Sequence, residues 1–227
     1  MALVPSVLTQ AGNLNVRRSV CLNFFAGSAA GYSSTPAGES MVARSCMWAS
    51  KKTSGTVRIF YMNASGSGTN VSTKLINFAN ANLPVSFTFT DSMVAGTSAL
   101  SILNHDVCIV TTNGNPDSTW ASPLQTFANA GGGLIITAFA NWYHFIPGFS
   151  YTTYTPINDF TPNTNNFNST DMNPSSIVSH PITTGLSSLT FNSESFAGSI
   201  NTLASGASAL AYYNNGSLLI SIKSVNL

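Results

Sequence analysis

A regular alternation of short apolar strands with amphipathic helical segments constrains this chain more than any other feature of its sequence. It is clearest in residues 116–141 (PDSTWASPLQTFANAGGGLIITAFAN), where a helical segment, a glycine turn and an apolar strand follow without a break. Ser122 precedes a proline and is the expected helix N-cap, with Ser118 as the alternative. The glycines at 131–133 are expected to end the helix. The strand at 134–139 is apolar on both faces, which is typical of a buried parallel strand.

The same alternation extends along the rest of the chain. Strands are predicted at residues 13–25, 57–63, 85–90 and 105–112, and helices at residues 36–50, 69–80 and 95–103. Strands separated by helices of this length indicate βαβ units and therefore an α/β domain with a mainly parallel sheet. Residues 207–213 and 217–224 predict a closing hairpin across the Asn-Asn-Gly turn at 214–216.

Composition narrows the classes of partner. Charged residues make up only 7% of the 227 residues, against about a quarter in ordinary globular domains. The net charge is +1 and the Lys and Arg residues are scattered, which argues against binding to nucleic acid or to an acidic membrane surface. No apolar run approaches the roughly 20 residues that membrane insertion needs. Near-zero net charge also favours association between copies of the chain.

Several sequence features point to an extracellular or cell-surface protein. Four Asn-X-Ser/Thr sequons make candidate N-linked glycosylation sites at Asn63, Asn70, Asn168 and Asn215. Asn, Ser, Thr and Gly take the solubilising role that Lys and Glu have in most intracellular proteins. The first residues lack the basic region and long apolar core of a signal peptide. We therefore expect a mature piece or a fragment of a longer, glycosylated protein.

The three cysteines do not form a metal-binding pattern. Cys108 lies inside an apolar strand and is expected to be a buried thiol. Cys21 and Cys46 form a possible disulfide if the strand and the helix that carry them pack together. Because the sequence has no CxxC motif and no Cys/His cluster, we expect neither a metal nor a cofactor.

Four segments carry a resemblance to a known family. They are residues 57–65 (VRIFYMNAS), 105–110 (HDVCIV), 130–136 (AGGGLII) and 180–186 (HPITTGL). In this order they resemble the class I glutamine amidotransferase-like superfamily, in particular its branch of trehalose-utilisation-type domains. The resemblance covers about residues 56–224. It implies a flavodoxin-like three-layer αβα sandwich with a mainly parallel sheet.

The two ends of the chain are exchanged relative to that family. Family domains usually finish with a strand of the kind seen at residues 12–25 and a helix that ends near a Trp, here Trp48. This pattern is missing after Ser224, so the N-terminal strand and helix are expected to supply the usual C-terminal end of the fold. The domain is either circularly permuted or one register of a tandem repeat. The expected organisation is a single domain, 1–227, with a permuted strand-helix segment (1–55), a βα core (56–141), a long loop (142–179) and C-terminal strands (180–227).

The resemblance also implies where a catalytic group would lie. Amidotransferases of this family carry a Cys directly after the strand that follows the glycine turn. Here that position falls at Ala138 or Phe139, so the nucleophile is absent and we do not expect an enzyme. Of the remaining histidines, His180 before a proline resembles a structural turn of the family, and His105 is interpreted as a strand cap.

An aromatic loop offers the alternative. Trp142, Tyr143, His144 and Phe145 form a possible ligand-binding or interface loop. His144 would make an acid/base pair with Asp159 or Asp171, or the rings would stack on a sugar. The competing interpretation of this loop is a packed aromatic cluster without chemistry.

The expected function is therefore structural. We expect a non-catalytic subunit of an extracellular glycosylated filament, coat or repeat array, whose partners are copies of itself and N-linked glycans. The alternative is a hydrolase or carbohydrate-binding domain that uses the loop around Trp142 and His144.

Overall fold

The domain is built on one seven-stranded mixed sheet with the strand order β3-β2-β4-β5-β1-β7-β6. A computed structural model describes residues 15–24, 36–63, 69–111, 116, 118–137, 146–158, 171–190 and 202–227. The strands are β1 (Val16–Leu22), β2 (Gly55–Asn63), β3 (Val85–Asp91), β4 (Val107–Thr111), β5 (Gly133–Thr137), β6 (Ala207–Tyr212) and β7 (Leu218–Asn226). The α/β class and the mainly parallel sheet are thus confirmed.

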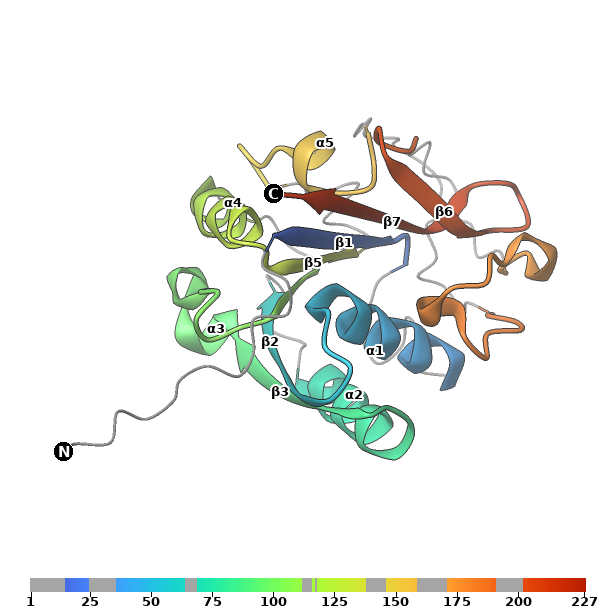
Figure 1. Ribbon diagram of the computed structural model, residues 1–227, viewed down its shortest axis with the longest axis horizontal. Helices are drawn as coiled ribbons and strands as arrows, with labels where there is room; N and C mark the ends of the chain where they lie inside the picture. The colour runs from blue at the N-terminus through green and yellow to red at the C-terminus, as the bar shows by residue number, and fades with distance from the viewer. Residues whose placement is uncertain are drawn as a thin grey trace.

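Helices alternate with these strands along the chain. The α-helices are α1 (Pro36–Ser50), α2 (Thr69–Asn82), α3 (Ser92–Ala95), α4 (Ala121–Asn129) and α5 (Tyr151–Tyr154). Single 3-10 turns lie at Thr97–Ala99, Ser118–Trp120, Pro174–Ser176 and Pro181–Thr183. Figure 1 shows α1 and α2 on one side of the sheet and α3 and α4 on the other, which gives three layers.

The parallel part of the sheet has the order typical of flavodoxin-like domains. Strands β3, β2, β4, β5 and β1 are parallel to one another, while β7 and β6 continue the sheet antiparallel beyond β1. Counted from β2 as the first strand, these five strands lie in the order 2-1-3-4-5 of a flavodoxin-like sheet. The N-terminal strand β1 therefore occupies the fifth place, between β5 and β7.

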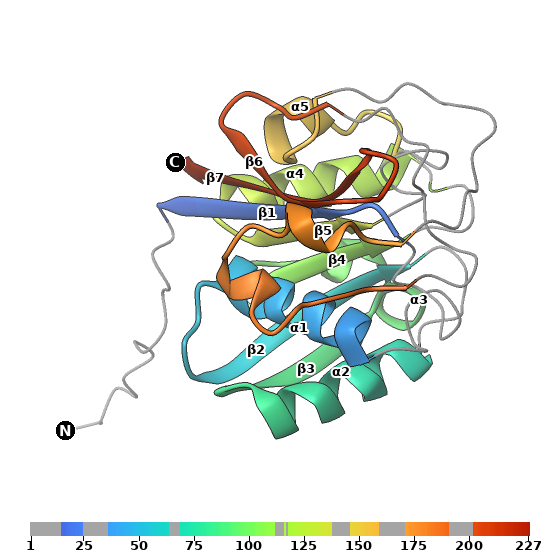
Figure 2. The same cartoon turned by 90° about the vertical axis from the view of Figure 1, so that its right-hand side faces the viewer.

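Side chains of the central strands alternate between two hydrophobic clusters because successive strand residues point to opposite faces. On β2, Ile59 and Tyr61 join the cluster under α1 and α2, whereas Phe60 and Met62 join the cluster under α4. Figure 2 shows α1 and α2 in front of the sheet from the second direction, with α4 on the far side. Burial on both faces explains why these strands are apolar throughout.

The connection between β3 and β4 differs from its prediction. A helix over residues 95–103 was expected, but the chain forms the four-residue α3 and a 3-10 turn, with Gly96 at a φ of 73° between them. A left-handed glycine of this kind breaks a helix. Because so short a helix covers little of the sheet, Ser86 and Thr88 on β3 are exposed.

The start of α4 also corrects a prediction. The 3-10 turn that begins at Ser118 runs directly into α4, so the N-cap position falls on Trp120, whose backbone is already helical. Ser122 lies inside the first turn and is not the N-cap. At the other end, Gly131 has a φ of 88°, which confirms the glycine turn as the helix stop.

Candidate functional site

The carboxyl ends of the parallel strands are the first place to look for a ligand. In open α/β sheets, ligands bind outside these ends where neighbouring strands have connections running in opposite directions. Here that point lies between β2, which leads to β3, and β4, which leads to β5. The strands end in Asn63 and Thr111, which are register partners, and β5 ends beside them in Thr137. All three residues are fully buried and neutral.

Several polar groups at this edge make hydrogen bonds within the fold. The Asn63 amide N–H donates to Ser92 Oγ (3.1 Å), and the Ser92 hydroxyl donates back to the Asn63 carbonyl (3.4 Å). The Thr137 hydroxyl donates to the carbonyl of Val110 (3.3 Å). Asp91 accepts from the amide of Met93 (2.9 Å) and so caps α3. These contacts fix loop and strand ends.

Tyr61, two residues before the end of β2, is kept in its neutral form. Burial, followed by the negative charge of Asp91, raises the pKa of Tyr61 far above its ordinary value. Tyr61 therefore holds its proton across the physiological range. A group with so high a pKa is poorly matched to proton transfer near neutral pH.

Most residues of the predicted catalytic or ligand-binding loop lie outside the described residues. This holds for Ala138 and Phe139, for Asp159, and for the aromatic loop Trp142, Tyr143, His144 and Phe145. Asp171 is described: it is exposed, and its backbone carbonyl accepts from the amide of Asn214 (2.9 Å). The pairing of His144 with a carboxylate stays a prediction.

The prediction of a possible disulfide between Cys21 and Cys46 is wrong. None of the three cysteines is in a disulfide, and all three are buried. Cys21 points into the cluster under α4, and Cys46 lies in the cluster under α1 and α2, so the sheet separates the two thiols. Burial raises the pKa of Cys46 and of Cys108 well above the ordinary thiol value. Such thiols stay protonated and are inert as nucleophiles, and Cys108 is the buried strand thiol that was predicted.

The four sequons occupy different environments. Asn63 ends β2 with no exposed surface, so it is not an acceptor in the folded domain. Asn215 is exposed in the turn between β6 and β7. Asn70 lies in the first turn of α2, and Asn168 lies outside the described residues. Glycosylation at Asn70, Asn168 and Asn215 remains a prediction.

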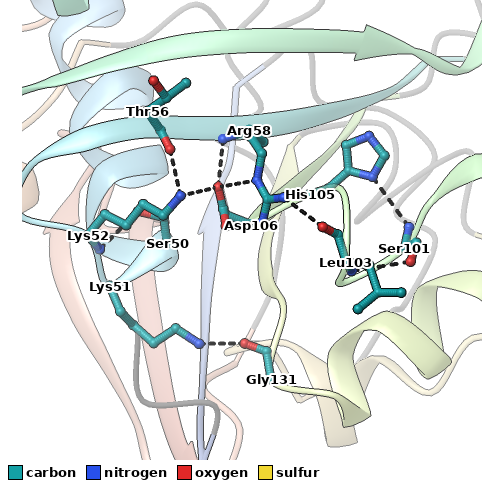
Figure 3. A network of polar contacts seen from close by, with 10 residues as sticks. All are labelled: Ser50, Lys51, Lys52, Thr56, Arg58, Ser101, Leu103, His105, Asp106 and Gly131. Carbon is teal, nitrogen blue, oxygen red and sulfur yellow. Dashed lines mark hydrogen bonds and ion pairs between the residues drawn. The ribbon is translucent and has the colours of Figure 1, made fainter. Parts of the chain in front are cut away.

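A charged network lies at the opposite, amino edge of the sheet (Figure 3). Asp106, just before β4, pairs with Lys52 Nζ (2.7 Å) and with Arg58 Nη2 (2.9 Å), and also accepts from the amide of Arg58 (2.7 Å). Burial by itself raises the pKa of Asp106, but the hydrogen bonds from Arg58 and Lys52 outweigh it and hold the pKa below its ordinary value. The network ties α1, β2 and β4 together.

Lys51 extends the same edge. It follows α1 with a φ of 64°, a left-handed conformation rare for a residue with a side chain. Its ammonium donates to the carbonyl of Val16 (2.9 Å) and to that of Gly131 (2.5 Å). The helix end is thereby attached to the starts of β1 and β5.

The two described histidines have structural roles, as predicted. His105 Nδ1 accepts from the amide of Ser101 (3.3 Å), and its Nε2 contacts Thr90 Oγ1 (3.1 Å). His180 Nδ1 accepts from the amide of Ile182 (3.2 Å) and caps a 3-10 turn. Burial lowers the pKa of both imidazoles, which keeps them neutral at pH 7.

The charged residues that stabilise the amino edge of the sheet were not predicted from the sequence. Lys51 and Lys52 stand directly after the helix predicted at residues 36–50, and Asp106 is distant from them in sequence. The available signal was local: a charged residue directly before or after an apolar strand in a chain with so few charges.

Neither metal ligation nor similarity to known proteins points to a further site in the described part of the chain. Within the described ranges, no three His, Cys, Asp or Glu residues lie close enough to hold a metal ion. No helix in that part of the chain is long and apolar enough to cross a membrane. Comparisons with protein-family models, with curated proteins and with solved structures give no match.

Proposed function

We propose that this chain is a non-catalytic structural subunit that associates with copies of itself in an extracellular, glycosylated filament, coat or repeat array. The observation that carries the proposal is the end of β5. This strand follows the glycine turn and ends at Thr137. The family that the chain resembles carries its catalytic Cys directly after this strand, and here that position is Ala138 or Phe139. Neither side chain is a nucleophile.

The strand order supports the family relationship behind this comparison. A flavodoxin-like sheet that starts at β2 needs a fifth strand and helix, and β1 with α1 occupies that place. We therefore propose a circularly permuted, amidotransferase-like domain or one register of a tandem repeat of such domains. In a tandem repeat, the same strand and helix would belong to the preceding unit.

The distribution of ionisable groups is the second support. At the described carboxyl edge β2, β4 and β5 end in an amide and two hydroxyls, Asn63, Thr111 and Thr137, all buried, and the carboxylate that ends β3, Asp91, caps α3. The charged side chains Lys52, Arg58 and Asp106 gather at the amino edge, where both cations pair with the one carboxylate. Charge in this domain thus serves packing, at the end of the sheet where α/β enzymes do not keep their active sites.

The surface chemistry supports self-association. Charged residues are 7% of the chain and the net charge is +1, so copies repel one another little. A surface solubilised by Asn, Ser and Thr is also suited to contacts between neutral copies of the same chain.

The proposal is tested by assaying hydrolysis and assembly on the same preparation. We expect concentration-dependent assembly in negative-stain electron microscopy, and no hydrolysis of ester or glycoside panels above the buffer rate. A monodisperse monomer whose hydrolytic activity disappears in His144→Ala, with unchanged thermal unfolding, would contradict it. Glycan binding that is lost in Trp142→Ala would instead establish the carbohydrate-binding alternative.

A further inference from the structure

The two edges of the sheet are protected very differently. At the β6 edge, the amide of Val178 donates to the carbonyl of Leu210 (2.9 Å), and the amide of Asn173 donates to that of Tyr212 (2.9 Å). Two register shifts also distort β6 against β7. Bulges and a covering segment are common devices against edge-to-edge pairing, so the β6 edge is closed.

Among the described residues, the β3 edge has none of these devices. Within the described chain, residues 85–91 make no backbone hydrogen bond to any element other than β2. The register with β2 is regular over the full strand, from Val85 to Asp91. The sequence VSFTFTD contains no Lys, Arg or Pro, and its one charge stands at the last position. An unguarded edge of this kind is a template for another strand.

One face of β3 is also open. Ser86 and Thr88 are exposed on the face that the short helix α3 leaves bare. On the other face, Phe87 is buried and Phe89 is partly buried. Their rings meet edge to face, with the ring centroids 6.4 Å apart. Figure 1 shows β3 at the end of the sheet, beside α2.

The strand is complementary to itself. In an antiparallel pair of β3 strands related by a two-fold axis at Thr88, Thr88 faces Thr88, Phe87 faces Phe89, and Ser86 faces Thr90. Aromatic pairs and hydroxyl pairs are the favourable cross-strand combinations. Asp91 would face the apolar Val85, so no like charges are opposed.

We propose that β3 pairs antiparallel with β3 of a second copy, which joins the two sheets into one across a two-fold axis at Thr88. The proposal rests on the self-association proposed above and names its contact surface. An isologous contact of this kind closes a dimer. A filament or coat would then need a second, different contact between such dimers.

The test begins with a charge placed on the axis. Thr88→Lys sets two ammonium groups opposite each other in the dimer, and the exposed position tolerates the longer side chain in the monomer. We expect sedimentation equilibrium to show a dimer dissociation constant raised about tenfold or more. Ser208→Lys, at an exposed position on the closed β6 edge, is the matched control and is expected to leave the constant unchanged.

A cysteine pair tests the register without relying on destabilisation. Facing residues of an antiparallel pair have Cα atoms about 4.5–5.5 Å apart, within the reach of a disulfide. Thr88→Cys is therefore expected to cross-link two copies under mild oxidation. Ser86→Cys is not, because its two copies lie four residues apart along the strands, about 14 Å. The three native thiols are buried and do not compete.

The outcomes separate the two proposals. Assembly that persists equally in Thr88→Lys and Ser208→Lys, without a Thr88→Cys cross-link, overturns the β3 contact and leaves self-association standing. Assembly that is lost on deleting residues 1–10, with Thr88→Lys unaffected, assigns the contact to the N-terminal segment and also overturns the β3 contact. A wild-type chain that stays monomeric to millimolar concentration overturns both proposals.

Discussion

At the residue scale, the charges of this domain stabilise the fold. Asp106 accepts from a lysine, an arginine and a backbone amide while only 10% of its side chain is exposed. A buried carboxylate is stabilised only when such partners replace its hydration. In a chain this poor in charge, one aspartate holds the starts of two neighbouring strands.

Replacing that carboxylate should therefore be costly. We expect Asp106→Asn to lower the free energy of unfolding by about 2–3 kcal/mol, because Lys52 and Arg58 lose their counter-ion while the amide keeps the shape. Urea titration measures the change. Asp171→Asn, at an exposed position, is the control and should change stability by less than about 0.5 kcal/mol. Equal effects of the two substitutions would contradict the structural role of the network.

The difference in stability between the wild type and Asp106→Asn should depend on pH. The pKa of Asp106 is lower in the folded state than its ordinary value of 3.8, so the unfolded state binds the proton more readily. The stabilisation is complete above that ordinary value and is lost as pH falls through the folded-state pKa. The difference between wild type and Asp106→Asn should therefore be constant near neutral pH and shrink below about pH 4. A difference that grows on acidification would contradict this assignment.

At the element scale, the position of α1 depends on a close approach to β5. A methyl group on Gly133 would lie 2.6 Å from the carbonyl oxygen of Ala49 and 3.0 Å from its Cβ. Backbone at that distance cannot yield without moving the helix. Gly133 is thus the point where the N-terminal helix is fitted against a strand far along the chain.

We expect Gly133→Ala to destabilise the domain by about 3 kcal/mol, since overpacking forces the helix and strand apart. Thermal unfolding and near-UV circular dichroism report the change. Adding Ala49→Gly should not restore stability, because the clash is with the Ala49 carbonyl rather than its side chain. Full rescue by the double substitution would show that the approach is looser than this.

The elements also show which predictions depended on local information. Strand β2 and helix α1 were predicted from local patterns, because apolar alternation and a helical stripe are set within a few residues. The helix expected at 95–103 failed because Gly96 and tertiary packing override its propensity. The Cys21–Cys46 pairing failed for another reason: Cys21 points to the face of the sheet that α1 does not cover, and which helix covers which face depends on the tertiary arrangement. The partners of Asp106 were likewise beyond reach, since strand order alone brings them together.

At the scale of the whole molecule, the end of β7 lies next to the start of β1. The amide of Leu227 donates to the carbonyl of Asn15 (2.7 Å), so β7 ends where β1 begins. A chain connected there and opened before β2 would run through the five parallel strands in the flavodoxin-like order, with β6 and β7 inserted before the last of them. The fifth-strand place of β1 therefore has a direct experimental consequence.

A circularly permuted chain that begins at β2 and ends with α1 should fold. We expect residues 55–227, joined by a two-residue Asn-Gly turn to residues 15–54, to show the same far-UV spectrum and cooperative unfolding as the parent. The new ends fall at Ser54 and Gly55, which are both exposed, and exposed turns tolerate permutation. A chain opened inside β4, between Ile109 and Val110, is the control and should not fold. Failure of the first design alone would contradict the placement of β1.

The central claim, a self-associating structural subunit, is tested most directly by sedimentation velocity of the wild-type chain from micromolar to millimolar concentration. We predict a sedimentation coefficient that rises with concentration to dimers and larger assemblies, and that falls back towards the monomer value in Thr88→Lys at the same concentration. A single monomer boundary over the whole range would contradict the claim.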